Sequence, residues 1–373
     1  MKTRTLLSDI IFILVILFVS GIGFISCVIS RETTINNTTI KTEPLLANSK
    51  DLQNTVITSN FNETISYNTN YVFTCGFNLA WNELIELLAG ELVKLQNNTP
   101  LVKYLNQQEF TNDVLSEDAY LAEAAFVGPN TIATLNEKLR AKFKNPPTIE
   151  EAGKDLLVFS YFEKDLKFEI PFGGDLNLCF FGNGDCNIVK AFGFATASGA
   201  QKYKNQALIR FLSFEEEEYE YEVILSLVTK KPDDELILAL VKPENTLRET
   251  YTKVKDLIET NNPDFSLSDV EALKIPKVTF QITHDYDELI GQQLLNIESE
   301  PYFITAAYQE IDFRLDEYGA TARVKSQMSM ERSIPFELIF NRPFMLIMKQ
   351  KYSDLPYIVI WIGNPEILIK TQR

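Results

Sequence analysis

Few residues in this sequence could carry out catalysis. Among its 373 residues there is one histidine, His284, in the stretch TFQITHDYDEL, and no G-x-S-x-G pattern accompanies it. A serine or cysteine nucleophile that is activated by histidine would have to use this residue. A lone histidine is more typical of a structural residue, so we expect His284 to lie in a turn or at the surface.

Paired carboxylates are the other catalytic option in a chain with 51 acidic residues. Asp285, Asp287 and Glu317 could act as acid and base, but no feature distinguishes them from the other acidic residues. The segment FGNGDC has neither the Lys-Ser/Thr of a phosphate-binding loop nor G-x-G-x-x-G spacing, and the usual zinc ligands are scarce. The sequence therefore predicts a protein that is not an enzyme and that uses no metal or cofactor.

The stretch from Leu315 to Phe344 offers the chemistry of a protease substrate. It reads LDEYGATARVKSQMSMERSIPFELIFNRPF, and from Ala320 to Met330 every second residue is small or apolar. Successive residues of a strand point to opposite faces, so this alternation predicts a strand with one buried face. The buried face would comprise Ala320, Ala322, Val324, Ser326, Met328 and Met330, and the other face Thr321, Arg323, Lys325, Gln327, Ser329 and Glu331.

The patterned segment ends at a bond that a protease could cut. Arg332 precedes Ser333, and trypsin-like proteases cleave after a basic side chain. No glycine or proline interrupts the residues between Gly319 and Pro335, which favours a strand. The alternative is that Arg332 is an ordinary solvated loop residue.

The N-terminus, residues 1–30, reads as a targeting segment. Lys2 and Arg4 precede an apolar run from Ile10 to Ile29, long enough to span a bilayer. The letters FISC before and at Cys27 resemble a lipobox, in which the cysteine is lipidated. Three alternatives stay open: a lipoprotein signal, an uncleaved anchor and a cleaved signal peptide. Each of them places the bulk of the chain outside the cytoplasm.

Residues 31–60 are rich in Thr, Asn and Ser and contain no aromatic residue. Such a composition buries too little apolar surface to fold, so we expect a disordered tether, followed by a folded domain over residues 61–373. The formal net charge of −16 argues against binding nucleic acid.

Cys179 and Cys186 are the two cysteines that lie close together in the sequence. The intervening letters FFGNGD contain Asn-Gly, which favours a tight turn, and in an oxidising compartment the pair could form a disulfide. Two unpaired thiols beside a turn are the alternative.

The hydrophobic pattern predicts helices first and strands mostly later, which indicates an α+β fold. Helices are expected over 77–95, with Asn78 as the N-cap, and over 119–125, 131–143 and 246–260. Strands are expected over 156–162, 207–214, 219–227, 236–241, 277–283, 310–315, 344–349 and 357–362.

The segment from Phe340 to Pro365, FNRPFMLIMKQKYSDLPYIVIWIGNP, resembles the closing hairpin of the serpins, a family of serine protease inhibitors. Upstream, LDEYG ending at Gly319 is similar to the hinge that begins a serpin reactive loop. Three further segments resemble serpin motifs in the same chain order: LKIPKVTFQITHDYDELIG, YFEKDLKFEIPF and VFTCGFNLAW. The resemblance covers residues 61–365.

This resemblance implies a serpin-like fold with a large central mixed β-sheet, additional sheets, a reduced set of N-terminal helices and an exposed reactive loop. It also implies that Glu317 and Gly319 belong to the hinge, and that the face listed above inserts into the central sheet after cleavage. Counting back from the closing hairpin places the scissile bond at Arg332-Ser333, whereas counting forward from the hinge places it at Ser333-Ile334.

The sequence also departs from the serpin pattern. Phe168 stands where the family has a tryptophan, and Val158 and Gln309 stand where it has an asparagine and a histidine that hydrogen-bond beneath the central sheet. We therefore expect that polar latch to be rebuilt or missing.

The function implied by the resemblance is inhibition of a trypsin-like serine protease by loop cleavage and insertion. The alternative is a non-inhibitory serpin-fold binding or structural protein at the cell surface. In both cases we expect a monomer that is secreted or tethered to a membrane by its N-terminus.

Overall fold

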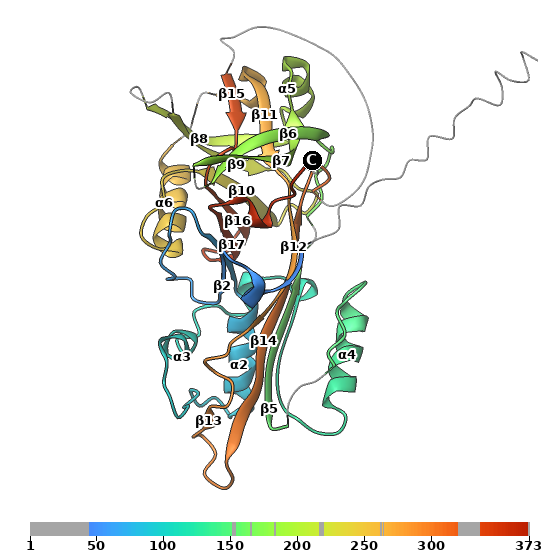
Figure 1. Cartoon of the computed structure of the whole chain (residues 1–373), viewed down its shortest axis with the longest axis vertical. Coiled ribbons are helices and arrows are strands. Elements are labelled where there is room, and N and C mark those ends of the chain that lie inside the picture. Colours follow the sequence, from blue (N-terminus) through green and yellow to red (C-terminus); the bar gives the residue numbers. More distant parts are fainter. Residues whose placement is uncertain are drawn as a thin grey trace, which may run out of the picture. The chain divides into compact units, whose positions relative to one another are not determined.

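The computed structural model describes residues 45–150, 154–164, 166–182, 184–215, 220–261, 263, 265–319 and 336–371 (Figure 1). Within these ranges the chain is α+β, with three mixed sheets and few helices. The helices are α2 (Gly76–Leu87), α3 (Pro100–Leu105), α4 (Thr131–Lys142), α5 (Ala197–Tyr203) and α6 (Leu247–Thr260), with the short 3-10 turns η1 (Ser49–Asp51), η2 (Asn112–Val114), η3 (Glu117–Ala119), η4 (Leu267–Asp269) and η5 (Pro365–Ile367).

The first sheet contains β1 (Leu45–Asn48), β12 (Val278–Asp285), β14 (Tyr302–Leu315), β5 (Leu156–Glu163) and β4 (Tyr120–Phe126) in that order, and β13 (Gln293–Leu294) pairs with β14. At its centre β14 and β5 run parallel, in register from Ala306 opposite Leu157 to Asp312 opposite Glu163. We call this parallel pair the seam. Helices α2 and α4 lie on opposite sides of it (Figure 1).

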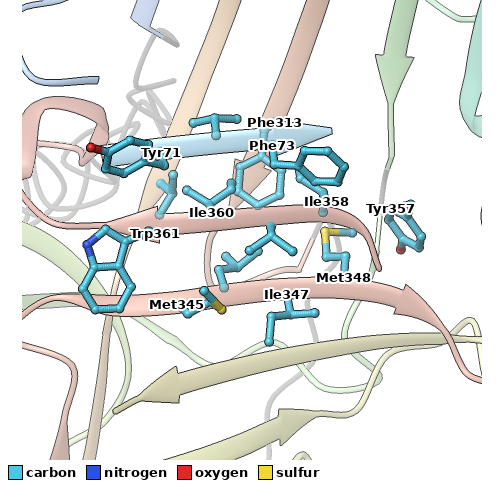
Figure 2. Packing of buried hydrophobic residues seen from close by; sticks show 14 of the residues in the cluster. Tyr71, Phe73, Phe313, Met345, Ile347, Met348, Tyr357, Ile358, Ile360 and Trp361 are labelled. Carbon is cyan, nitrogen blue, oxygen red and sulfur yellow. The ribbon is translucent and has the colours of Figure 1, made fainter. Parts of the chain in front are cut away.

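The second sheet has the order β2 (Thr55–Thr58), β3 (Asn70–Thr74), β17 (Pro356–Ile362), β16 (Phe344–Gln350), β10 (Asp234–Leu240), β9 (Glu220–Leu227) and β8 (Ala207–Glu215). Its central hairpin β16–β17 supplies much of the core: Trp361, Tyr357 and Met345 are fully buried, and Figure 2 shows them packed around the two strands. Because both faces are covered, these strands read as continuous apolar runs, which explains why the sequence predicted them well.

The third sheet has the order β15 (Phe336–Ile339), β11 (Val270–Pro276), β7 (Asp185–Phe194) and β6 (Gly173–Gly182). Cys179 and Cys186 lie on the β6–β7 hairpin, and their sulfur atoms are bonded with a Cα–Cα distance of 5.2 Å. The sequence left this pairing open, and in the structure the bond closes the hairpin tip.

Two predictions about helices are wrong. The segment over 119–125 is strand β4, because pairing along the whole of β5 satisfies its backbone and buries Tyr120 and Leu121. The first helix ends at Leu87 rather than near residue 95, since Ala89 and Gly90 adopt positive φ angles that stop a helix. Its expected cap, Asn78, lies inside the helix and donates to the carbonyl of Ser59.

The predicted tether is wrong in its second half. Leu45–Asn48 forms β1 beside β12, and Thr55–Thr58 forms β2 beside β3. Between them Glu366 accepts hydrogen bonds from the amides of Gln53 and Asn54. Partners far along the chain therefore order this polar segment, and its own composition gave no sign of them.

None of the helices in the described ranges is long and apolar enough to cross a membrane.

Candidate functional site

The candidate site lies where β14 ends and the patterned loop begins. Residues 320–335 fall outside the described residues, and with them the predicted inserting positions from Ala320 to Met330 and the predicted scissile residues Arg332, Ser333 and Ile334. Cys27, the predicted lipidation site, falls outside them too. The structure describes the two predicted hinge residues, Glu317 and Gly319, and both sides of the seam.

Residues Asp316–Gly319, which we call the hinge, form a tight turn directly after β14. The amide of Gly319 donates to the carbonyl of Asp316 at 3.1 Å, and the two residues form an antiparallel β-bridge. The Asp316 carboxylate caps the turn, accepting from the Tyr318 amide at 2.9 Å and from Arg314 Nε at 2.6 Å. The hinge thus turns the chain back toward the strand that it has just left.

The hinge is anchored to the segment that follows β5. The amides of Phe168 and Phe172 donate to the carbonyls of Tyr318 and Glu317 at 3.1 and 2.8 Å. Gly319 has a φ of +67°, and a Cβ atom there would lie 2.3 Å from the carbonyl oxygen of Leu166. Only glycine accommodates both the backbone angle and this close approach.

An ion pair fastens the hinge to Lys277, the residue between β11 and β12. The Nζ atom of Lys277 lies 2.5 Å from Oε2 of Glu317, and both side chains are largely buried. Lys277 immediately follows β11 and precedes β12, so the pair joins the hinge to the junction of two sheets. The sequence had pointed to Glu317 but not to its partner.

The inward side of the seam carries a buried amide. Gln309 is 1% exposed, and its Oε1 atom accepts from the Thr74 hydroxyl at 3.0 Å, which links β14 to β3 of the second sheet. Its Nε2 atom has no hydrogen-bond partner among the described residues, and Ser160 of β5 lies directly opposite in the ladder. Gln309 therefore makes one hydrogen bond, to Thr74, and retains an unused donor in the described structure.

The outward side of the seam carries three carboxylates. Asp312 lies opposite Glu163 across the parallel pair, and Glu310 lies opposite Tyr161. Burial raises the pKa of Glu310 to about 7. Burial, and next the charge of Glu163, also raise the pKa of Asp312. Like charges that face each other on adjacent strands destabilise the pairing of β14 with β5.

The far end of the loop enters a different sheet. Phe336 begins β15, which runs parallel to β11 in the third sheet. The hydroxyl of Tyr221 fixes the end of this strand, because it accepts from the Ile339 amide at 2.6 Å and donates to the Ile339 carbonyl at 3.1 Å. Residues 320–335 thus connect the end of the first sheet to the start of the third.

His284 and its acidic neighbours are used elsewhere. The Nδ1 atom of His284 lies 2.8 Å from the Ser49 hydroxyl, and burial lowers the pKa of the histidine to about 4. The ammonium group of Lys50 bridges Asp285 and Asp287 at 3.3 and 2.8 Å. These contacts fasten η1 to the end of β12. In the described parts of the chain, no group of acidic, histidine and cysteine side chains is arranged to hold a metal ion.

Comparison with solved structures finds the crystal structure of human glycosylated kallistatin, a serpin, with 13% sequence identity and a TM-score of 0.49. The match covers 80% of this chain and 92% of that chain. No protein-family model and no curated protein matches the sequence. A likeness at this identity concerns the fold alone.

Proposed function

We propose that this protein is a serpin-like inhibitor of a trypsin-like serine protease, which cleaves its loop near Arg332-Ser333 or Ser333-Ile334. The observation that carries the proposal is the position of the hinge: it stands at the end of the seam, and the antiparallel bridge between Asp316 and Gly319 turns the chain back toward β14. A strand that entered there would lie between β14 and β5.

The lengths agree with this mechanism. Strand β14 has 14 residues, Tyr302–Leu315. Residues 320–333, from the hinge to the predicted scissile position, are also 14 in number. Fully inserted, the cleaved loop would therefore accompany β14 to its start and carry the cut end to the opposite end of the sheet.

Insertion would also improve the hydrogen bonding of the sheet. In the closed sheet β14 and β5 are parallel, and a strand that returns from the hinge runs antiparallel to both. Antiparallel ladders are slightly more stable per residue than parallel ones. Burial of Val324, Met328 and Met330 adds about 1.5–3 kcal/mol for each side chain.

The inhibitor would act outside the cytoplasm as a monomer, either secreted or held at a membrane by residues 1–30. The apolar run and Cys27 support tethering, and residues 31–44 leave a polar spacer before β1. Arg332 would direct the loop to proteases that have a carboxylate in their specificity pocket.

Incubation of the full chain with trypsin, followed by denaturing electrophoresis, tests the proposal. We expect a covalent complex that is lost in Arg332→Ala and retained in Lys351→Ala, a basic residue in a turn far along the chain. Cleavage of the loop without a complex would favour instead the non-inhibitory serpin-fold protein.

A further inference from the structure

Two basic residues stand out in the predicted inserting segment. Arg323 and Lys325 are two positions apart, so they share the outward face of a strand. On the outward face of the seam, Glu310 and Asp312 are also two positions apart. None of the three seam carboxylates, Glu163 included, has an ion-pair partner among the residues that the structure describes, and Arg314 is bound to Asp316.

The hinge fixes the register in which these groups would meet. Asp316 and Gly319 already pair as an antiparallel bridge. In an antiparallel ladder each step forward on one strand is a step back on the other, so Arg323 falls opposite Asp312 and Lys325 opposite Glu310. Because Glu163 lies opposite Asp312, Arg323 would stand between two carboxylates.

The same register accounts for the inward face. It sets Ala322 opposite Phe313 and Val324 opposite Ile311, and both of these β14 residues are buried. It sets Ser326 opposite Gln309, whose buried Nε2 atom lacks an acceptor in the described structure. A serine hydroxyl is a suitable acceptor for that amide. Buried unsatisfied donors are rare, so this one is an independent indication that the seam is built to receive a polar partner.

We propose that the outward face of the seam, Glu163, Glu310 and Asp312, is a charge-complementary receptor for Arg323 and Lys325 of the cleaved loop. The inference rests on the proposed loop insertion and assigns its register. Without the inserted strand, Asp312 and Glu163 face each other. After insertion Arg323 would lie between these two carboxylates and Lys325 would lie opposite Glu310. The added strand would also separate β5 from β14. The two basic side chains of the loop would thus favour its insertion.

A single cut in the full chain gives the test. A glutamate-specific endoproteinase cleaves after Glu331, and mass spectrometry verifies the position. After cleavage we measure, in low salt, the rate at which the chain converts to a form that unfolds at a higher temperature, as expected for the inserted loop. We expect the Arg323→Ser, Lys325→Ser double variant to form it about five- to tenfold more slowly than the wild type. The matched control Thr321→Ser, Gln327→Ser, which changes two neutral residues of the same face, should keep the wild-type rate.

Two further arms separate the outcomes. Added salt should slow the wild type toward the rate of the Arg323, Lys325 double variant, since screening weakens partly exposed charges. Charge exchange, Arg323→Glu and Lys325→Glu together with Glu310→Lys and Asp312→Lys, should restore fast insertion that either half alone abolishes. Equal, salt-independent rates for the wild type and the neutral variant would overturn the receptor and leave loop insertion standing. Failure of every chain to gain stability, the wild type included, would overturn loop insertion itself and the receptor with it.

Discussion

At the scale of single residues, the ion pair of Lys277 with Glu317 should stabilise the hinge. Its side chains are 11% and 15% exposed, whereas those of Lys50 and Asp287 are 52% and 65% exposed. Removing one partner of a largely buried pair leaves an uncompensated charge. We expect Lys277→Ala to lower the free energy of unfolding by about 3 kcal/mol. Lys50→Ala is the control and should have a much smaller effect in the same urea titration. Equal effects would show that the hinge pair contributes no more than a surface pair.

Glu310 should make stability depend on pH. Its neighbours across the ladders are Thr283 and Tyr161, with Asp312 and Glu163 alongside, so no cation offsets its burial. Burial raises its pKa from 4.5 to about 7. A carboxyl group whose pKa is raised on folding stabilises the folded state fully at pH values below its unfolded pKa. That contribution is lost as the pH rises through the folded pKa. The free energy of unfolding of Glu310→Gln, relative to that of the wild type, should therefore rise by on the order of 2 kcal/mol between pH 5 and pH 8.

Thermal unfolding of both proteins across that range measures the effect of Glu310. His284 has a lowered pKa of about 4 and changes stability in the opposite direction, but it is common to both chains and cancels in the difference. Parallel curves for Glu310→Gln and the wild type would contradict the burial of this carboxyl group.

At the scale of elements, the disulfide should stabilise the third sheet modestly. It closes a loop of seven residues' separation at the tip of a hairpin whose strands are already paired. Closing so short a loop removes little entropy from the unfolded chain, about 2 kcal/mol. The Cys179→Ser, Cys186→Ser variant should lose about that amount and keep its far-ultraviolet circular dichroism. Loss of the folded state would mean that the bond is required for the sheet to form.

The elements also show which parts of the fold local sequence can predict. Helix α6 was expected from the amphipathic pattern over 246–260, and the structure shows in addition that Thr246 and Glu249 form a capping box at its start. Strands β4, β1 and β2 were not expected, since their pairing partners lie elsewhere in the chain. The hinge was predicted from its motif. The three seam carboxylates were not, because only the register of β14 against β5 brings them together.

At the scale of the whole molecule, the proposed loop insertion requires the first sheet to be less stable than the same sheet with one more strand. Six inward side chains would enter the core, and the parallel seam would become two antiparallel ladders. The orphaned amide of Gln309 and the opposed carboxylates Asp312 and Glu163 are features that the closed sheet leaves unsatisfied. The proposed insertion would supply a partner for each of these groups.

The most direct test compares the thermal unfolding midpoint of the intact full chain with that of the chain cleaved once after Glu331. We expect cleavage to raise the midpoint by more than about 10 °C, because the added burial and hydrogen bonds should increase the free energy of unfolding by several kcal/mol. A midpoint that stays the same or falls after cleavage would contradict loop insertion and, with it, the proposed inhibitory mechanism.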